Sequence, residues 1–376
     1  MKQYRIEEIC EVISGGTPST KVANYWNGDI IWLTPKDLSS ATTKWIFQSS
    51  NKITKDGLDN SAARMLPVNT VLLSSRAPIG YLALAGKPLC TNQGFKSMIC
   101  NTNYILPEYL YYYLHTKVEE LNNISTGSTF KELSSSLLKN YVVRIHDLTT
   151  QRHIVDILGS IDNSIENNNK KIENLINFGQ LKYQEDISSN DYEYMALSKL
   201  VKISRGASPR PIQNYLTTTG HSWVKISDVT SLSAPFLFET KEYITDEGTN
   251  HSVAVYPNDL ILSNSATPGI PVFMETNAFV HDGWLIIRDF KKITPNYLFW
   301  VLKNDRNIIL SQGNGSIFTN LKTDILKSHE IPVPSKEKME KLDNLYSTIL
   351  LKIKHLTKEN LKLKELKQLY LKKFFG

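Results

Sequence analysis

The sequence has little cysteine and no long apolar segment. Its three cysteines, Cys10, Cys90 and Cys100, are odd in number and show no Cys-x-x-Cys spacing, which favours free thiols over a disulfide framework or a zinc site. No stretch approaches the roughly 18 apolar residues that a membrane-spanning helix needs. The opening residues also lack the apolar core of a signal peptide. We therefore expect a cytoplasmic protein with reduced thiols.

Catalytic motifs are missing as well. The chain has no Pro-Pro dipeptide, which excludes the Asn/Asp-Pro-Pro-aromatic motif of adenine methyltransferases. The nearest approach to a phosphate-binding loop, Gly86-Lys87, is followed by Pro88 and has Tyr81 where the leading glycine should stand. Neither His-Glu-x-x-His nor Gly-x-Ser-x-Gly occurs. We predict that the chain is no enzyme and holds no metal or cofactor of its own.

Charge is balanced over most of the chain. The net charge of +6 is carried by the segment from Lys336 to the C-terminus, which has 11 lysines and 5 acidic residues, while the rest has 32 basic and 32 acidic residues. Binding to nucleic acid would therefore depend on local patches in the globular parts. The lysine-rich end is either a solvated helix face or a docking surface for an acidic partner or DNA phosphates.

The chain of 376 residues, long enough for two or three domains, contains an internal repeat. At an offset of 188, Ile105–Leu114 returns as Ile293–Leu302, and Gly127–Leu133 returns as Gly315–Leu321. The upstream matches have slightly different offsets, as loop insertions would cause: Ile13-Ser14 and Gly16 with Ile203-Ser204 and Gly206, Trp32 and Asp37 with Trp223 and Asp228, and Leu73-Ser74 with Leu262-Ser263.

Each copy has a globular part followed by a helical part. Residues 1–147 and 188–335 contain short β-like runs between Gly, Pro, Ser and Thr turn signals. In both parts a proline, Pro107 or Pro295, stands where a helix would begin. Residues 148–187 and 336–376 instead show helical spacing. The predicted fold class is α+β, with two repeated α/β domains separated by two long helices.

Apolar residues in both helical segments recur at spacings of 3 and 4, as in a coiled-coil seam. We predict that the two seams pair in an antiparallel coiled coil, although each helix could instead pack only on its own domain. Asn168 and Asn360 lie in or beside the seam, either fixing its register or tolerated at a wet position. The predicted apolar seam residues are Ile154, Leu158, Ile161, Ile165, Ile172 and Leu175 in the first helix, and Leu342, Leu345, Ile349, Ile353, Leu356, Leu363, Leu366 and Tyr370 in the second.

This doubled order of globular part and helix closely resembles the specificity subunits of type I restriction–modification systems, over essentially the whole chain. The likeness rests on the following segments: Ile13-Ser-Gly-Gly-Thr-Pro18, Trp32-Leu-Thr-Pro-Lys-Asp-Leu38, Ile203-Ser-Arg-Gly-Ala-Ser-Pro209, Gly315-Ser-Ile-Phe-Thr-Asn-Leu321, Ile331-Pro-Val-Pro334 and the closing run from Leu363 to Phe375. The first copy departs from the family at Val143–Asp147, which lacks the proline-rich entry into the helix.

The resemblance implies a DNA-binding subunit that reads a bipartite target, one half-site for each globular domain. It also implies that the helices set the spacing between the half-sites and dock two methyltransferase (M) subunits. Restriction and motor (R) subunits would join this complex. S-adenosylmethionine, ATP and Mg²⁺ would then belong to these partner subunits.

Polar and basic residues in the β-rich loops are the candidates for DNA contact, because such side chains read base edges and hold phosphates. Each could equally be a solvated surface residue. The framework residues are the same in the two copies, whereas the loop residues differ. Two domains of one fold that read different half-sites would show this pattern, and neutral drift would also produce it. The candidates are Lys36, Arg64, Ser75, Arg76, Asn92, Gln93 and Lys96 in the first domain, and Arg205, Ser208, Arg210, Lys225, Asn264, Ser265 and Thr267 in the second.

Two other kinds of function are weighed against this one. The His-Asp pairs, His146-Asp147 and His281-Asp282, lie at unequal places in the repeat, so we interpret them as turn or surface residues rather than a catalytic site. The cysteines are interpreted as core or surface thiols. A divergent methyltransferase or nuclease, or a coiled-coil adaptor that ignores DNA, are the remaining alternatives.

Overall fold

A computed structural model describes residues 1–376 except 40, 42, 127–130, 189–191 and 313–319. The repeated motif Gly127–Leu133 and Gly315–Leu321 therefore lies largely outside the described residues. The chain forms two compact units: unit 1 is Met1–Glu166 with Leu361–Gly376, and unit 2 is Asn167–Asn360. These units divide both long helices, and the predicted four-part division at residues 147, 187 and 335 stays a prediction.

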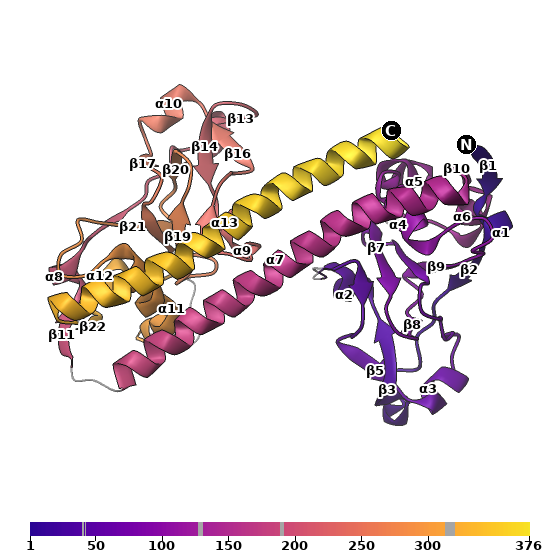
Figure 1. The fold of residues 1–376 in the computed structure, drawn as a ribbon, viewed down its shortest axis with the longest axis horizontal. Coiled ribbons are helices and arrows are strands. Elements are labelled where there is room, and N and C mark those ends of the chain that lie inside the picture. The colour runs from indigo at the N-terminus through magenta and orange to yellow at the C-terminus, as the bar shows by residue number, and fades with distance from the viewer. Residues whose placement is uncertain (40, 42, 127–130, 189–191, 313–319) are drawn as a thin grey trace. The chain divides into compact units, whose positions relative to one another are not determined.

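The described residues of unit 1 form three β-sheets. Figure 1 shows most of this unit in indigo and purple. Its largest sheet has five strands in the order β2-β9-β6-β7-β4. The bounds of these strands are β2 Cys10–Ser14, β4 Trp45–Ile46, β6 Val71–Ser75, β7 Ile79–Ala85 and β9 Phe95–Cys100. The other sheets pair β3 (Trp26–Leu33) with β5 (Asn51–Ile53) and β8 (Cys90–Thr91), and β1 (Lys2–Arg5) with β10 (Val142–Ile145). The short helices are α1 Ile6–Ile9, η1 Ala23–Tyr25, α2 Pro35–Ser39, α3 Lys55–Asp59, α4 Pro107–His115, α5 Val118–Ile124 and α6 Ser135–Asn140.

Unit 2 repeats this arrangement strand for strand in a five-stranded sheet of the order β12-β21-β18-β19-β15. These strands are β12 Lys202–Arg205, β15 Phe236–Leu237, β18 Leu260–Ser263, β19 Pro271–Met274 and β21 Trp284–Arg288. A second sheet has the order β13-β16-β14-β20-β17, with β13 Leu216–Thr217, β14 His221–Val224, β16 Glu242–Ile244, β17 Val253–Val255 and β20 Ala278–Val280. The pair β11 (Glu193–Ala196) and β22 (Glu330–Val333) corresponds to β1 and β10. The helices are α8 Leu197–Leu200, α9 Ile226–Thr230, η2 Ile212–Asn214, α10 Asp246–Thr249, α11 Pro295–Ser311 and α12 Thr323–Ser328.

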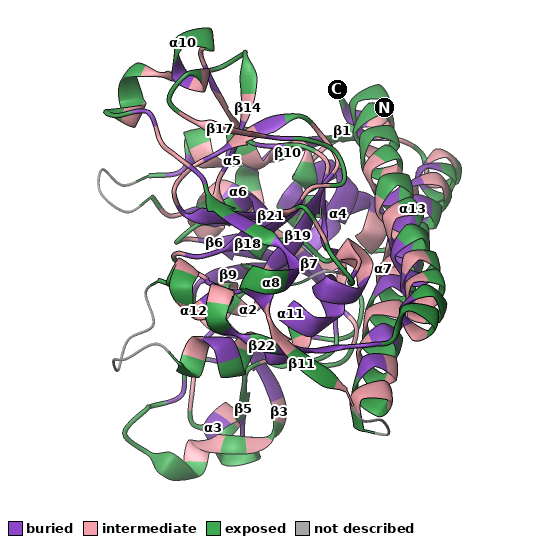
Figure 2. Cartoon of the chain, turned by 90° about the vertical axis from the view of Figure 1, so that its left-hand side faces the viewer, coloured by how far each residue is buried: buried purple, intermediate pink, exposed green. Residues whose placement is uncertain are grey.

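Each unit has its own apolar core, beside the sheet of β6 in unit 1 and the sheet of β18 in unit 2. The strands β6 and β18 are buried in Figure 2, and β21 is buried except at its last residue. Their apolar runs suit strands that are covered on both faces. The helices α4 and α11 pack on these sheets and begin at Pro107 and Pro295, as predicted. Proline suits the first helical position because its missing N–H would have no partner there.

Two long helices complete the units: α7 (Leu148–Ser188) and α13 (Lys336–Phe375). In unit 1, Ile154 and Leu158 of α7 share a buried cluster with Leu371 and Phe375 at the end of α13. In unit 2, Ile172 of α7 shares a cluster with residues from the first half of α13. The helices thus run in opposite directions, which confirms the predicted antiparallel packing and fold class.

The seam follows the predicted residues except near the end of α13. Ile154, Leu158, Ile161, Ile172, Ile349, Ile353 and Leu356 are buried, and Ile165, Leu175, Leu342, Leu345, Leu363 and Tyr370 are half-buried. Leu366 differs from the prediction, because it is 40% exposed. Beyond Asn360 the contact line runs through Lys367, whose Nζ lies 2.6 Å from Asp162 Oδ1, and then through Leu371. This shift by one residue turns the contact face by about 100°.

The asparagines of the seam form a buried hydrogen-bonded group. Asn168 and Asn360 are each 5% exposed, and Asn168 Nδ2 donates to Asn360 Oδ1 over 3.1 Å. Asn360 Nδ2 in turn donates to Asn169 Oδ1 over 2.9 Å. A buried amide with a partner of its own kind disfavours slipped pairings, in which it would be left without that partner. The group therefore supports the register-fixing interpretation.

Replacing one asparagine should cost more stability than replacing both. Asn168→Leu leaves Asn360 Oδ1 buried without its donor, and we expect the free energy of unfolding to fall by about 1–3 kcal/mol. Asn168→Leu with Asn360→Leu removes both buried amides and leaves only the half-buried Asn169 Oδ1 without its donor, so it should recover most of that loss. Urea unfolding of the full-length chain measures both values. A double variant as unstable as the sum of the two single variants would contradict the pairing.

Candidate nucleic-acid interface

Three loops meet at one end of the sheet that contains β6 in unit 1 and β18 in unit 2, and we call this group the three-loop site. In unit 1 it comprises residues 14–18, 75–78 and 92–94, and in unit 2 residues 205–210, 264–268 and 281–283. Matching backbone hydrogen bonds join the second and third loops: Ser75 N–H donates to Gly94 O over 2.7 Å, and Asn264 N–H to Gly283 O over 2.8 Å. The same frame is therefore built twice.

The second loop is a strand-connecting hairpin with the same internal bonds in both units. Ser74 Oγ donates to Pro78 O over 2.8 Å, and Ser263 Oγ donates to Thr267 O over 2.7 Å. Each of these serine hydroxyls also accepts a backbone N–H, from Tyr81 in β7 and from Ile270 just before β19. The residues Ala77 and Ala266 both adopt left-handed backbone, with φ of 51° and 56°. Local side-chain bonds of this kind fix a turn independently of the residues it exposes.

The third loop is held by one matching bond within it and one from the first loop. Gly94 N–H donates to Asn92 Oδ1, and Gly283 N–H to His281 Nδ1, each over 2.9 Å. Thr17 Oγ1 donates to Gln93 Oε1, and Ser208 Oγ donates to Asp282 Oδ1. Gln93 and Asp282 thus occupy equivalent positions, with an amide in one unit and a carboxylate in the other.

The first loop shows that the sequence match between the copies is one residue out of register. Sequence comparison pairs Gly16 with Gly206, but the structure pairs Gly15 with Gly206. A Cβ on either glycine would overlap the backbone of the third loop, at Thr91 and Asn92 or at Val280 and His281. Strand pairing agrees, because Ser14 lies opposite Lys96 and Arg205 lies opposite the equivalent residue, Leu285. A shift by one residue moves each side chain to the other face of the strand.

Five of the seven candidates in unit 1 lie in or beside the three-loop site: Ser75, Arg76, Asn92, Gln93 and Lys96. Lys96 Nζ lies 3.7 Å from Glu132 Oε1. Burial lowers the pKa of Lys96, Glu132 opposes that shift, and Arg76 adds to it. Lys36 and Arg64 are exposed on other segments, and the side chain of neither makes a polar contact within the described part of the chain.

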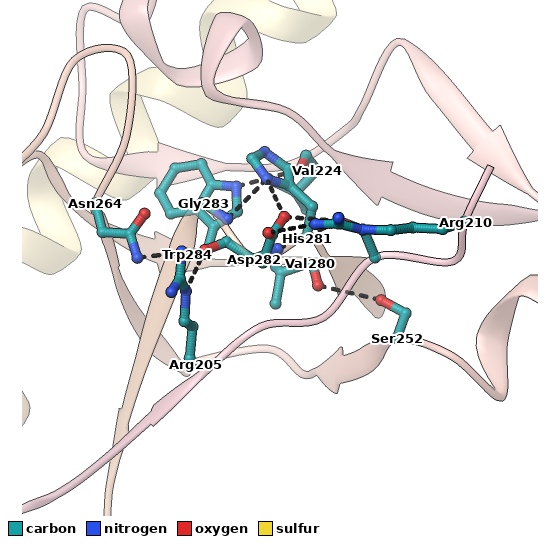
Figure 3. A network of polar contacts seen from close by, with 11 residues as sticks. Arg205, Arg210, Val224, Ser252, Asn264, Val280, His281, Asp282, Gly283 and Trp284 are labelled. Atoms are coloured by element: carbon teal, nitrogen blue, oxygen red, sulfur yellow. Dashed lines mark hydrogen bonds and ion pairs between the residues drawn. The ribbon is translucent and has the colours of Figure 1, made fainter. Parts of the chain in front are cut away.

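In unit 2 the candidates gather around Asp282, one of the residues that the sequence alone places in a turn or on the surface (Figure 3). Arg205 Nε donates to Asp282 O over 2.7 Å and Asn264 Nδ2 donates to the same oxygen over 3.3 Å. Arg210 Nη2 donates to Asp282 Oδ2 over 3.2 Å. With Ser208 on Oδ1, four of the seven candidates contact this one residue.

Asp282 is ionised in this setting. Burial raises its pKa, but the hydrogen bond from Ser208, the backbone N–H of Asp282 itself and the charge of Arg210 together lower the pKa below its usual value.

Of the three remaining candidates in unit 2, two belong to the three-loop site and one lies outside it. Ser265 and Thr267 belong to the hairpin, and a Cβ on Gly283 would overlap Ser265 Oγ. Lys225 instead forms an ion pair of 2.7 Å with Glu242.

The described residues offer little for other chemistry. Among them, no three His, Cys, Asp or Glu residues are grouped so as to hold a metal ion. Burial raises the pKa of Cys90 to about 11, which makes it a poor nucleophile. Cys10 and Cys100 lie opposite each other on β2 and β9, with 3.8 Å between their sulfur atoms. In the described part of the chain, no helix is both long and apolar enough to cross a membrane.

Comparison with known proteins identifies the family. A family model described as the type I restriction modification DNA specificity domain matches residues 1–177 and again residues 189–368. The chain belongs to this family. It is 28% identical over 401 aligned positions to the type I restriction enzyme MjaIX specificity subunit of Methanocaldococcus jannaschii, covering 99% of this chain and 92% of that protein. It is also 28% identical over 162 positions to the EcoR124I/EcoR124II specificity subunit of Escherichia coli, covering 41% of this chain and 39% of that protein.

A solved structure supports the fold. The S subunit of a type I restriction–modification system from M. genitalium matches 100% of this chain and 96% of its own, with a TM-score of 0.63 and 14% sequence identity. The family resemblance drawn from the doubled sequence is thus confirmed. Which loop residues contact DNA remains a prediction.

His281 provides a pH-dependent test of the three-loop site. Burial and the charge of Lys225 lower its pKa below the ordinary value of 6.5, although Asp282 and Asp228 oppose the shift. As the pH falls below 6.5, the unfolded chain takes up the proton first, so the free energy of unfolding should fall with pH. His281→Asn, which copies Asn92 of unit 1, should keep the bond to Gly283 and reduce this pH dependence.

Urea unfolding of the full-length chain between pH 5 and pH 8 measures this effect. The reciprocal variant Asn92→His serves as the matched control and should add a loss of stability on the acidic side. If His281→Asn left the slope of stability against pH unchanged, the half-buried imidazole of His281 would not be the group responsible.

Proposed function

We propose that each unit binds one half of a bipartite double-stranded DNA target, so that the chain acts as the non-catalytic specificity subunit of a type I restriction–modification complex. One observation carries this proposal: the three-loop site is built twice on a single hydrogen-bonded frame, with different polar side chains on each copy. A fixed frame with variable side chains suits two domains that read different base pairs. The exposed polar candidates would read base edges, and the exposed cations would hold phosphates. Ser75, Lys96 and Asn264 are buried and would instead support the loops from within.

Cations lie at or beside both three-loop sites, on different strands and loops. Unit 1 has Arg76 on the hairpin and the buried Lys96 on β9, while unit 2 has Arg205 at the end of β12 and Arg210 on the loop that follows. Residues 1–335, these cations included, have no overall excess of positive charge, with 32 basic and 32 acidic residues. We therefore expect weak DNA binding by the chain alone and tight binding only within a complex.

The proposed complex contains two M subunits docked on the helices and domains, together with R subunits. S-adenosylmethionine, ATP and Mg²⁺ would bind to those subunits rather than to this chain, in the cytoplasm. Both α7 and α13 contribute to both units, which supports a role for the helices in setting the distance between half-sites. The lysine-rich face of α13 is a candidate for docking an acidic partner surface.

Base-resolution methylome sequencing of the source cell, with and without this gene, tests the proposal. We expect one bipartite motif to be methylated only when the gene is present, and to reappear when the gene is restored. Persistence of every methylated motif after deletion would refute the proposal and favour a coiled-coil adaptor that ignores DNA. Methyl transfer by the isolated chain would instead favour an enzyme.

A further inference from the structure

The equivalence of Gln93 and Asp282 has a consequence for base recognition. Each directly follows the residue, Asn92 or His281, that accepts the N–H of the glycine in the third loop. Each also accepts a hydrogen bond from a hydroxyl group of the first loop, that of Thr17 or Ser208. Both also reach solvent: Gln93 is exposed, and the side chain of Asp282 is 41% exposed. The structure thus presents two different side chains from the same place in the repeated fold.

The backbone around this position is firmly held. Gly94 and Gly283 follow it, and a Cβ on Gly283 would overlap both His281 and Ser265 Oγ. The Ser75 and Asn264 N–H groups bind the carbonyls of these glycines. Rigid support of this kind fixes the direction of the exposed side chain before any ligand binds, which lowers the entropic cost of recognition.

The two side chains match different base pairs. The Gln93 carboxamide has a donor and an acceptor, which together fit the N6 and N7 atoms of adenine in the major groove. Asp282 has acceptors only, but Arg210 lies 3.2 Å from it and supplies donors. In the major groove a C·G pair shows a donor, the cytosine N4 amine, beside two acceptors, guanine O6 and N7. The pair of Asp282 and Arg210 has the complementary arrangement.

Arg210 is well placed for this role. Its side chain is 79% exposed and makes a single hydrogen bond within the described part of the chain, so most of its guanidinium donors face solvent. Ser208 occupies Asp282 Oδ1, which leaves the carboxylate oriented while its remaining lone pairs stay available. In the register that pairs Gly15 with Gly206, Ser19 of unit 1 is equivalent to Arg210 of unit 2. Unit 2 therefore has both the acid, Asp282, and the arginine, whereas unit 1 has neither at these positions.

We propose that Gln93 and Asp282 are specificity-determining residues at the same step of the two half-sites, with Gln93 selecting an A·T pair and Asp282, together with Arg210, selecting a C·G pair. This inference rests on the proposed function and adds to it the identity of one base pair in each half-site. It also predicts that the two half-sites differ at that step.

Isosteric variants test the assignment in the whole complex. Asp282→Asn and Gln93→Glu each keep the shape of the side chain while exchanging a donor and an acceptor. Each variant is expressed in the source cell in place of the natural chain, and the methylated motifs are sequenced. Asp282→Asn should reduce the preference for C·G at one position of one half-site by about tenfold or more, and Gln93→Glu should do the same for A·T in the other half-site.

The matched control is Asp289→Asn, which removes an exposed acid of unit 2 that faces Lys202 over 3.8 Å, away from the three-loop site. It should leave every letter of the motif unchanged. The double variant Asp282→Gln with Arg210→Ser copies unit 1 and should convert the C·G position to A·T.

The outcomes separate the two proposals. If the natural chain directs no bipartite motif, the proposed function fails. If it does, but the half-sites lack the required C·G or A·T pair, or the isosteric variants leave all letters unchanged or weaken all positions equally, the assignment of Gln93 and Asp282 is overturned. If either variant stops methylation entirely, competition between duplexes that differ at single base pairs, measured on the purified complex, decides by the same criterion.

Discussion

Replacing Gly179 by alanine is expected to destabilise the protein by about 1–3 kcal/mol, because a Cβ at this position would overlap the indole ring of Trp300. Gly179 lies in α7 and is buried, and Trp300 lies in α11 and is fully buried in the core of unit 2. The overlap can be relieved only by moving the helix or the ring. Closely packed interiors resist both movements.

The sign of this effect distinguishes packing from helix propensity. In an exposed helix interior, alanine is more favourable than glycine by about 1 kcal/mol. Gly159 provides the matched control on the same helix, because the nearest side-chain atom to a Cβ there is Lys44 Nζ at 3.5 Å, an ordinary contact distance. Gly159→Ala should therefore stabilise the chain while Gly179→Ala destabilises it.

Urea unfolding of the full-length chain, fitted for both the midpoint and the slope, gives the two free energies. Opposite signs are expected. A stabilising Gly179→Ala would mean that α7 does not pack against Trp300 at this distance, and the description of the unit 2 core would have to change.

The large-scale architecture could be predicted from the sequence because it depends on patterns that repeat over many residues. The spacings of 3 and 4 in residues 148–187 and 336–376 identify α7 and α13, and the doubled order identifies two related units. Pro107 and Pro295 mark two helix starts correctly. Each of these signals has a local physical cause, which is apolar periodicity or the missing N–H of proline.

Register was harder to predict because a single residue decides it. Matching Gly16 with Gly206 preserves more identical neighbours, whereas the close approach of the third loop requires Gly15 to take that place. The prediction that Leu366 lies in the seam is wrong for a related reason. The 3-and-4 spacing of apolar residues continues through Leu366. The ion pair between Lys367 and Asp162, however, holds the neighbouring face of α13 against α7.

The importance of Asp282 also escaped sequence reasoning, which interpreted the dipeptide His281-Asp282 as a turn or surface feature. One signal could have found it. At the offset of 189 that pairs Ser74 with Ser263, Asp282 falls on Gln93, a candidate already chosen in the first domain. The contacts of Arg205, Ser208, Arg210 and Asn264 arise from residues far apart in sequence, so only the structure brings them together.

Exchanging one globular part tests the central claim most directly, which is that each unit reads its own half-site. Residues 1–147 are replaced by the corresponding part of a relative with a known motif, and the methylome of a strain carrying the chimera is sequenced. Because each unit has its own core and its own three-loop site, its base contacts should be separable from those of the other unit. We expect one half of the methylated motif to change to that of the relative, while the half read by unit 2 stays unchanged. A chimera that alters both halves, or neither half while still directing methylation, would contradict the account.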